Sequence, residues 1–200
     1  MRSCHLRLVL LVVLAALMGS ITPAAADTQV IRMETLEDGN AFIPSSPRRP
    51  IGTVFRWRNV DSSGQHTATR TTIITWDFTV AAGETSPGKR IKYAGTFMYF
   101  CRVHEAMNAS LGIRPRITPD PEEAGSYLLT LGTELPPGGL VFDVQRRLGT
   151  GAWTHWRTGT SARRVEFRPS GTERHAFRAR LRQDDEPASR WSPQVTFDPS

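Results

Sequence analysis

Four side chains in the first half of the chain are of types that bind transition metals. Cys101, His104 and Met107 are spaced as Cys-x-x-His-x-x-Met, and His66 lies 35 residues before Cys101, after another strand-like run. One thiolate, two imidazoles and one thioether form the ligand set of copper sites that transfer electrons. The thiolate and imidazoles would form a trigonal plane, and the thioether would be a weak axial ligand. These residue types predict one type 1 site that cycles between Cu(I) and Cu(II) without a substrate.

Other interpretations of the same residues are more ordinary. A single cysteine at a strand end and a single methionine are commonly buried hydrophobic side chains. Zinc is the main alternative metal, but structural zinc sites use more cysteine and histidine ligands. The joint occurrence of all four residues at this spacing favours copper.

Residues 1–26 have the layout of a secretory signal peptide. Basic residues precede an apolar run, Leu8 to Met18, and three alanines precede Asp27. A membrane-spanning helix needs about 20 apolar residues, and this run has roughly half that length. We therefore expect cleavage after Ala26 and a soluble exported protein, secreted or periplasmic, without a transmembrane anchor.

Cleavage would leave a single thiol. Cys4 would be lost with the signal peptide, so that Cys101 has no cysteine partner for an intramolecular disulfide. A free thiol is a liability in an oxidising compartment unless it is occupied, and a metal ion is a natural occupant.

The charge of the cleaved chain is mildly positive. It has 23 basic and 19 acidic residues, a net charge of about +4, and the whole excess lies in residues 27–116. The basic residues do not cluster with aromatic ones in an RNA-binding pattern, which argues against nucleic-acid binding. We expect a monomer whose partner is a redox protein with an acidic surface.

The sequence pattern predicts two all-β domains. The polar, proline-punctuated segment 117–125 is predicted to be a linker between residues 27–116 and 126–200. Both parts have short alternating runs separated by turn residues, as expected for two β-sandwiches. In the first part we predict strands at Thr28–Met33, Thr53–Asn59, Thr72–Trp76, Lys89–Tyr93, Thr96–Cys101 and Ser110–Ile113. In the second part we predict them at Tyr127–Gly132, Val141–Leu148, Trp153–Arg157, Arg163–Phe167, His175–Arg182 and Gln194–Phe197.

Residues 53–113 resemble the small blue copper proteins of the plastocyanin, amicyanin and pseudoazurin family, the cupredoxins. The matching segments are Phe55 to Asn59 with Asp61, His66 to Thr69, Ala82 to Glu84, Gly95 to His104, and Met107. The resemblance implies a Greek-key β-sandwich in which His66, Cys101 and His104 bind copper in the plane and Met107 binds it axially. It also implies that the edge of His104 passes electrons to a partner through an apolar surface. Thr67 departs from the pattern, since many relatives have asparagine there.

Residues 126–198 resemble a fibronectin type III domain, which implies a second, immunoglobulin-like β-sandwich. The matching segments are Phe142 to Arg147, Gly151 to Trp156, His175 to Leu181 and Arg190 to Pro193. Arginines alternate with apolar residues in 175–182, which predicts a solvated sheet face. Trp153, Trp156 and Trp191 fit either core positions or an aromatic binding surface. His155 and His175 have no partner at metal-ligand spacing.

The function that these observations favour is an exported blue copper protein that carries single electrons between redox partners. We do not expect an enzyme, because no Ser-His-acid arrangement is evident and the four histidines that would remain after signal cleavage are too few for a trinuclear copper cluster. Two alternatives stay open: a protein that sequesters copper without an electron-transfer partner, and a structural, adhesion-type pair of β domains.

Overall fold

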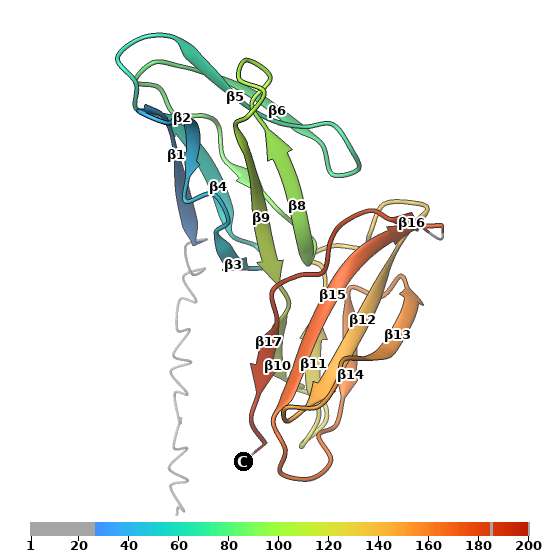
Figure 1. Ribbon diagram of the computed structural model, residues 1–200. Helices are drawn as coiled ribbons and strands as arrows, with labels where there is room; N and C mark the ends of the chain where they lie inside the picture. Colours follow the sequence, from blue (N-terminus) through green and yellow to red (C-terminus); the bar gives the residue numbers. More distant parts are fainter. Residues whose placement is uncertain (1–26, 185, 200) are drawn as a thin grey trace, which may run out of the picture.

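The computed structural model describes residues 27–184 and 186–199, which fold into two β-sandwiches placed end to end (Figure 1). This described part contains strands and turns and no helix, so the all-β sandwich prediction is confirmed. The predicted signal peptide, residues 1–26, lies outside the described residues. Within those residues, no helix is long and apolar enough to cross a membrane.

The first sandwich consists of two sheets, and the chain crosses between them several times. The strand orders are β2-β1-β4-β7 and β3-β9-β8-β5-β6. β1 is parallel to β4 and β3 is parallel to β9, whereas the other pairs are antiparallel. The strands are β1 (Thr28–Leu36), β2 (Gly39–Ile43), β3 (Arg48–Pro50), β4 (Val54–Asn59), β5 (Gln65–Arg70), β6 (Trp76–Ala81), β7 (Lys89–Arg90), β8 (Gly95–Phe100) and β9 (Asn108–Arg114).

Alternating side chains fill the space between these sheets. In β4, Phe55 and Trp57 are fully buried while the arginines between and after them are exposed. In β8, Phe97 and Tyr99 are buried, and the ring of Tyr99 packs edge-on against Trp57. Side chains two residues apart lie on the same face of a strand. The alternation that packs the core therefore also directs Cys101, which follows β8, into the protein.

The second sandwich has sheets of strand order β10-β11-β14 and β13-β12-β15-β16, with β17 also paired to β15. Its core contains the buried rings of Phe142, Phe167 and Phe177. The strands are β10 (Arg116–Pro119), β11 (Tyr127–Thr130), β12 (Leu140–Leu148), β13 (Thr154–Thr160), β14 (Arg164–Phe167), β15 (His175–Gln183), β16 (Glu186–Pro187) and β17 (Val195–Phe197). The fibronectin type III-like assignment stays a prediction.

The two sandwiches meet at the end of β8 that is farthest from Cys101 (Figure 1). Thr96 and Arg190 exchange two backbone hydrogen bonds, of 2.9 and 3.1 Å. The side chain of Arg70 is buried at this contact and donates to the carbonyl oxygens of Met98 (2.8 Å) and Ala188 (3.2 Å). Buried apolar residues from both sandwiches belong to one continuous cluster.

The predicted linker 117–125 is wrong in its first part. Residues 116–119 form β10, which pairs antiparallel with β11 in the second sandwich. Ile117 packs against the core, and Pro119 is tolerated because β10 is an edge strand. Since β9 ends at Arg114, the chain passes from one sandwich to the other at Pro115.

The strand prediction was also wrong around β5 and β6. Residues Thr72 to Thr75 form no strand, and Ile73 and Ile74 have positive φ values of 28° and 55°. A positive φ is incompatible with an extended strand, so β6 begins only at Trp76. β5 itself was not predicted, although it carries His66.

Candidate metal centre

The predicted ligands come from two neighbouring strands and the loop after one of them. His66 is the second residue of β5, Cys101 directly follows β8, and His104 lies in the loop between β8 and β9. β5 and β8 are antiparallel neighbours through Thr69 and Phe100. This pairing brings the beginning of β5 next to the end of β8, and so it places His66 beside Cys101.

Three donor atoms form a triangle. Nδ1 of His66 and Nδ1 of His104 are 3.1 Å apart, and they lie 4.0 and 3.6 Å from Sγ of Cys101. A point equidistant from the three atoms lies about 2.1 Å from each of them, which matches the roughly 2.0–2.3 Å of metal–nitrogen and metal–sulfur bonds. The triangle therefore has the size that a trigonal metal ion requires.

Asp61 orients the imidazole of His66. Its carboxylate accepts a hydrogen bond from Nε2 of His66 at 2.9 Å, so the ring proton is on Nε2 and the lone pair of Nδ1 faces Cys101. Asp61 in turn accepts hydrogen bonds from the backbone N–H (2.9 Å) and hydroxyl (2.8 Å) of Thr35. Partial burial would raise the pKa of Asp61, but the hydrogen bonds from Thr35 and His66 outweigh it and the pKa is lowered. The carboxylate form is thus favoured beside His66.

Thr67 links the two ligand-bearing segments. Its backbone N–H donates to Sγ of Cys101 at 3.2 Å, which stabilises negative charge on the sulfur. Its hydroxyl oxygen accepts the backbone N–H of Arg102 at 2.7 Å. The residue that departs from the cupredoxin pattern therefore still bridges β5 and the loop after β8.

Met107 closes the ligand loop. Its backbone N–H donates to the carbonyl oxygen of His104 at 3.0 Å, and its own carbonyl oxygen accepts the N–H of Cys101 at 2.9 Å. The Met107 side chain is 1% exposed. The loop is thus tightly turned, with the thioether buried; axial ligation by Met107 stays a prediction.

The triad is enclosed on one side and close to the surface on the other. Cys101 and His66 are 1% and 2% exposed, whereas His104 is half-buried and its neighbour Val103 is 48% exposed. Among the described residues, His66, Cys101 and His104 are the one group of three or more His, Cys, Asp or Glu side chains whose donor atoms converge.

Sequence reasoning missed Asp61 and Thr35, the two residues that hold His66 in place through hydrogen bonds. Asp61 was noted within the segments that resemble cupredoxins but was given no role, and Thr35 was not considered. An acidic residue five positions before a predicted histidine ligand is a usable signal, because metal-bound histidines commonly donate their second ring N–H to a carboxylate. Thr35 comes from β1, and nothing in its sequence position connects it to His66.

No protein-family model and no curated protein matches the chain. Several solved structures are similar to part of it. Amicyanin from Paracoccus versutus is 18% identical over 46% of this chain and 85% of that chain, with a TM-score of 0.37. A pseudoazurin from Sinorhizobium meliloti is 20% identical over 44% of this chain and 73% of that chain, with a TM-score of 0.35. A Cu-containing nitrite reductase from Thermus scotoductus is 21% identical over 44% of this chain but 22% of that chain, with a TM-score of 0.37.

Proposed function

We propose that this protein is an exported blue copper protein that carries single electrons between redox partners. The observation that carries the proposal is the triangle of Sγ of Cys101 and Nδ1 of His66 and His104, with sides of 3.1, 3.6 and 4.0 Å. One soft thiolate and two imidazoles, with a thioether on the same loop, favour copper over zinc, whose structural sites use more Cys and His ligands. Copper bound there would supply one-electron chemistry.

Two residues, Asp61 and Thr67, hold the proposed ligands His66 and Cys101 in place through hydrogen bonds. Asp61 holds His66 in the tautomer whose Nδ1 can donate to a metal, and Thr67 N–H offsets charge on the sulfur of Cys101. Thr67 lies in β5, and Asp61, in the loop before β5, is held by Thr35 of β1, so little rearrangement is needed when the charge of the site changes by one unit. A carrier benefits from such rigidity, because each rearranged bond would add to the barrier for electron transfer.

The surroundings of the site favour a carrier over a catalyst. Cys101 and His66 are almost fully buried, so among the three donors only half-buried His104 lies near the surface. We assign Met107, buried on the same loop, as the axial ligand. We assign half-buried His104, next to exposed Val103, as the group through which electrons reach a redox partner.

Voltammetry of the copper-loaded full chain tests this function. We expect a reversible one-electron couple and fast reduction and reoxidation by small redox mediators. Cys101→Ser, which removes the thiolate and preserves the side-chain size, should abolish the couple. Tight copper binding with slow or irreversible exchange would favour the sequestering protein instead. Absence of copper binding would contradict both functions and leave the structural pair of β domains.

A further inference from the structure

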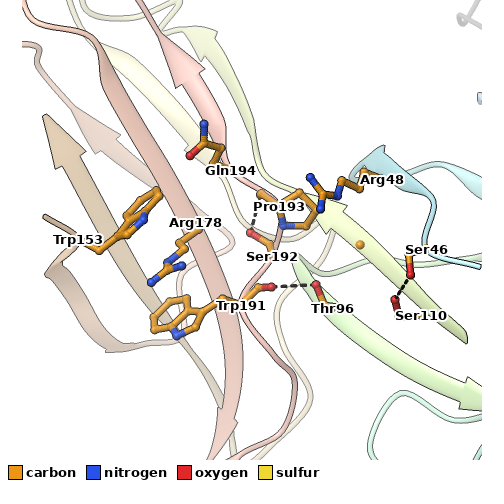
Figure 2. Close-up of a pocket in the computed structure, with 11 residues that line it drawn as sticks. Ser46, Arg48, Thr96, Ser110, Trp153, Arg178, Trp191, Ser192, Pro193 and Gln194 are labelled. Carbon is orange, nitrogen blue, oxygen red and sulfur yellow. Dashed lines mark hydrogen bonds between the residues drawn. The ribbon is translucent and has the colours of Figure 1, made fainter. Parts of the chain in front are cut away.

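A cleft of about 400 Å³ lies between the two sandwiches, far from the metal centre. Figure 2 shows its lining: Ser46, Arg48, Thr96 and Ser110 come from the first sandwich, and Trp153, Arg178, Trp191 and Gln194 from the second. Thr96 is five residues before Cys101 along an extended strand, a separation of about 17 Å. The cleft is therefore independent of the proposed copper site.

Arginines and tryptophans form a stacked ladder on the second sandwich side of this cleft. The guanidinium of Arg178 lies 4.4 Å from the ring centroid of Trp153 and 5.1 Å from that of Trp191. Arg147 stacks on the outer face of Trp153 (4.9 Å), and Arg180 on that of Trp191 (4.6 Å). In β15, Arg178 and Arg180 alternate with buried apolar residues, as predicted, and the face that they form is partly rather than fully solvated.

The positive charge of the cleft is only partly balanced. Arg180 pairs with Asp143, but the described residues give Arg178 no carboxylate partner. Arg178 donates through Nε to Gln145 at 2.8 Å, which leaves its two Nη groups without a partner among those residues. Arg48 is exposed and has no hydrogen-bond or ion-pair partner in that part of the chain. None of the described residues that line the cleft is acidic.

The other polar groups of the lining can also donate hydrogen bonds. The side-chain oxygen of Gln194 accepts from Arg147 at 3.0 Å, so its NH₂ group stays available. The hydroxyls of Ser46 and Ser110 share one hydrogen bond of 3.1 Å, which leaves one hydroxyl proton to donate elsewhere. Two guanidinium groups, an amide and a hydroxyl are the donors that phosphate, sulfate and carboxylate groups require.

We propose that this cleft binds an oxyanion-bearing ligand, with Arg48 and Arg178 contacting it from opposite sandwiches. Its volume is in the range of small-molecule sites, which occur preferentially at domain interfaces. The tryptophan faces are covered by arginines, so recognition acts through charge and hydrogen bonds rather than by stacking on indole rings. The oxyanion is either a free small anion or a group carried by a larger molecule, for which a sulfated sugar serves as the probe.

Titration of the full chain, followed by NMR of the indole N–H signals, tests the proposal. The chain has five tryptophans, of which Trp153 and Trp191 line the cleft. The probes are inorganic sulfate, a sulfated disaccharide, and uncharged lactose. We expect saturable shifts of the Trp153 and Trp191 signals with a sulfated probe and none with lactose. Binding of both sulfated probes supports a free anion as ligand, and binding of the disaccharide alone supports an oxyanion carried by a larger molecule.

Substitutions at two cleft arginines and at one arginine outside the cleft test whether the probes bind in the cleft. Arg48→Gln is at an exposed side chain and should raise the Kd about ten-fold, as the loss of a charge-assisted hydrogen bond requires. Arg178→Lys keeps the charge but loses the planar fork and should also weaken binding. Arg164→Gln, at an exposed position of β14 outside the cleft, is the control with the same loss of charge.

Two results would overturn the proposal: no saturable binding of either sulfated probe below roughly 10 mM, or an equal effect of Arg164→Gln and Arg48→Gln. Cys101→Ser should bind the probes unchanged, so the outcome does not depend on the copper function.

Discussion

At the residue scale, the metal centre depends on side chains that fix the ligands as much as on the ligands. Asp61 accepts the Nε2–H of His66, and Thr35 holds Asp61 through two hydrogen bonds. A carboxylate behind a histidine ligand makes the imidazole a stronger donor and fixes the orientation of its ring. Asp61 is therefore a positioning residue that also places one negative charge near the metal.

Neutralising Asp61 should raise the reduction potential. Asp61→Asn keeps an oxygen that can accept from His66 but removes a negative charge that favours Cu(II) over Cu(I). We expect an increase of roughly 50 mV, measured by voltammetry of the copper-loaded chain. Asp38→Asn, in the exposed turn between β1 and β2, is the charge-matched control and should change the potential little. A lower or unaltered potential in Asp61→Asn would refute this role.

The convergence of Cys101, His66 and His104 could be predicted from the sequence because residue types and spacing indicate it. A Cys-x-x-His-x-x-Met segment after an alternating strand leaves few other uses for those three residues together. Asp61 and Thr35 could not be predicted in the same way, since their roles depend on the packing of β1 beside β4 and on the position of β5.

At the scale of elements, strands with clear apolar alternation such as β4, β8 and β15 were predicted, whereas β5 was not. Its sequence Gln-His-Thr-Ala-Thr-Arg has almost no apolar side chains, yet five of its six residues are buried. They are buried because the polar groups face the metal centre and the second sandwich: His66 and Thr67 at one end, Arg70 at the other. The buried side chains of such a strand are polar, because they belong to the candidate site and to the contact between the sandwiches. The strand therefore lacks the alternation of apolar and polar residues on which strand prediction relies.

β15 contains a buried histidine that should make stability depend on pH. His175 is fully buried among Phe167, Phe177 and Phe197, and neither of its ring nitrogens has a hydrogen-bond partner in the described part of the chain. Burial, reinforced by the charge of Arg146 and opposed by Glu173, lowers its pKa below the ordinary 6.5. The native state thus binds fewer protons than the unfolded state, and this residue costs stability as the pH falls below about 6.5.

His175→Phe should remove that part of the pH dependence. Phenylalanine preserves an aromatic ring and has no proton to gain, so the variant should gain stability relative to the parent chain as the pH is lowered from 7.5 to 5. Urea unfolding at several pH values measures the difference, with exposed His155→Gln as control. Parallel stability curves for the parent and the His175→Phe protein would contradict the assignment.

At the scale of the whole molecule, the second sandwich is fixed to the first at the end away from the metal. Besides the Thr96–Arg190 hydrogen bonds, Pro193 packs closely over Gly112, where an added Cβ would lie 2.7 Å from Cγ of Pro193. The second sandwich consequently does not cover His104, through which we propose that electrons reach a redox partner. The sequence pattern predicted the order of the two domains along the chain but not the contact between them. The contact is formed by backbone groups and a glycine, which carry no hydrophobic or charge pattern that a sequence analysis could detect.

Gly112→Val should loosen the contact between the sandwiches. The added side chain collides with the ring of Pro193, and overpacking of this kind costs about 1–3 kcal/mol. We expect a lower melting temperature and an unfolding transition that is broader or split in two, measured by calorimetry. Gly138→Ala, at a position with nothing within 4 Å of the added Cβ, should leave the transition unchanged. Identical melting curves for the two variants would contradict a fixed interface.

The central claim is that Cys101, His66 and His104 form a type 1 copper site, and the absorption spectrum of the Cu(II)-loaded full chain tests it most directly. Charge transfer from the thiolate of Cys101 to copper should give an intense band near about 600 nm. Cys101→Ser should lose this band, whereas Asp61→Asn should keep it. A colourless Cu(II) form of the parent protein, or a band that survives in Cys101→Ser, would contradict the claim.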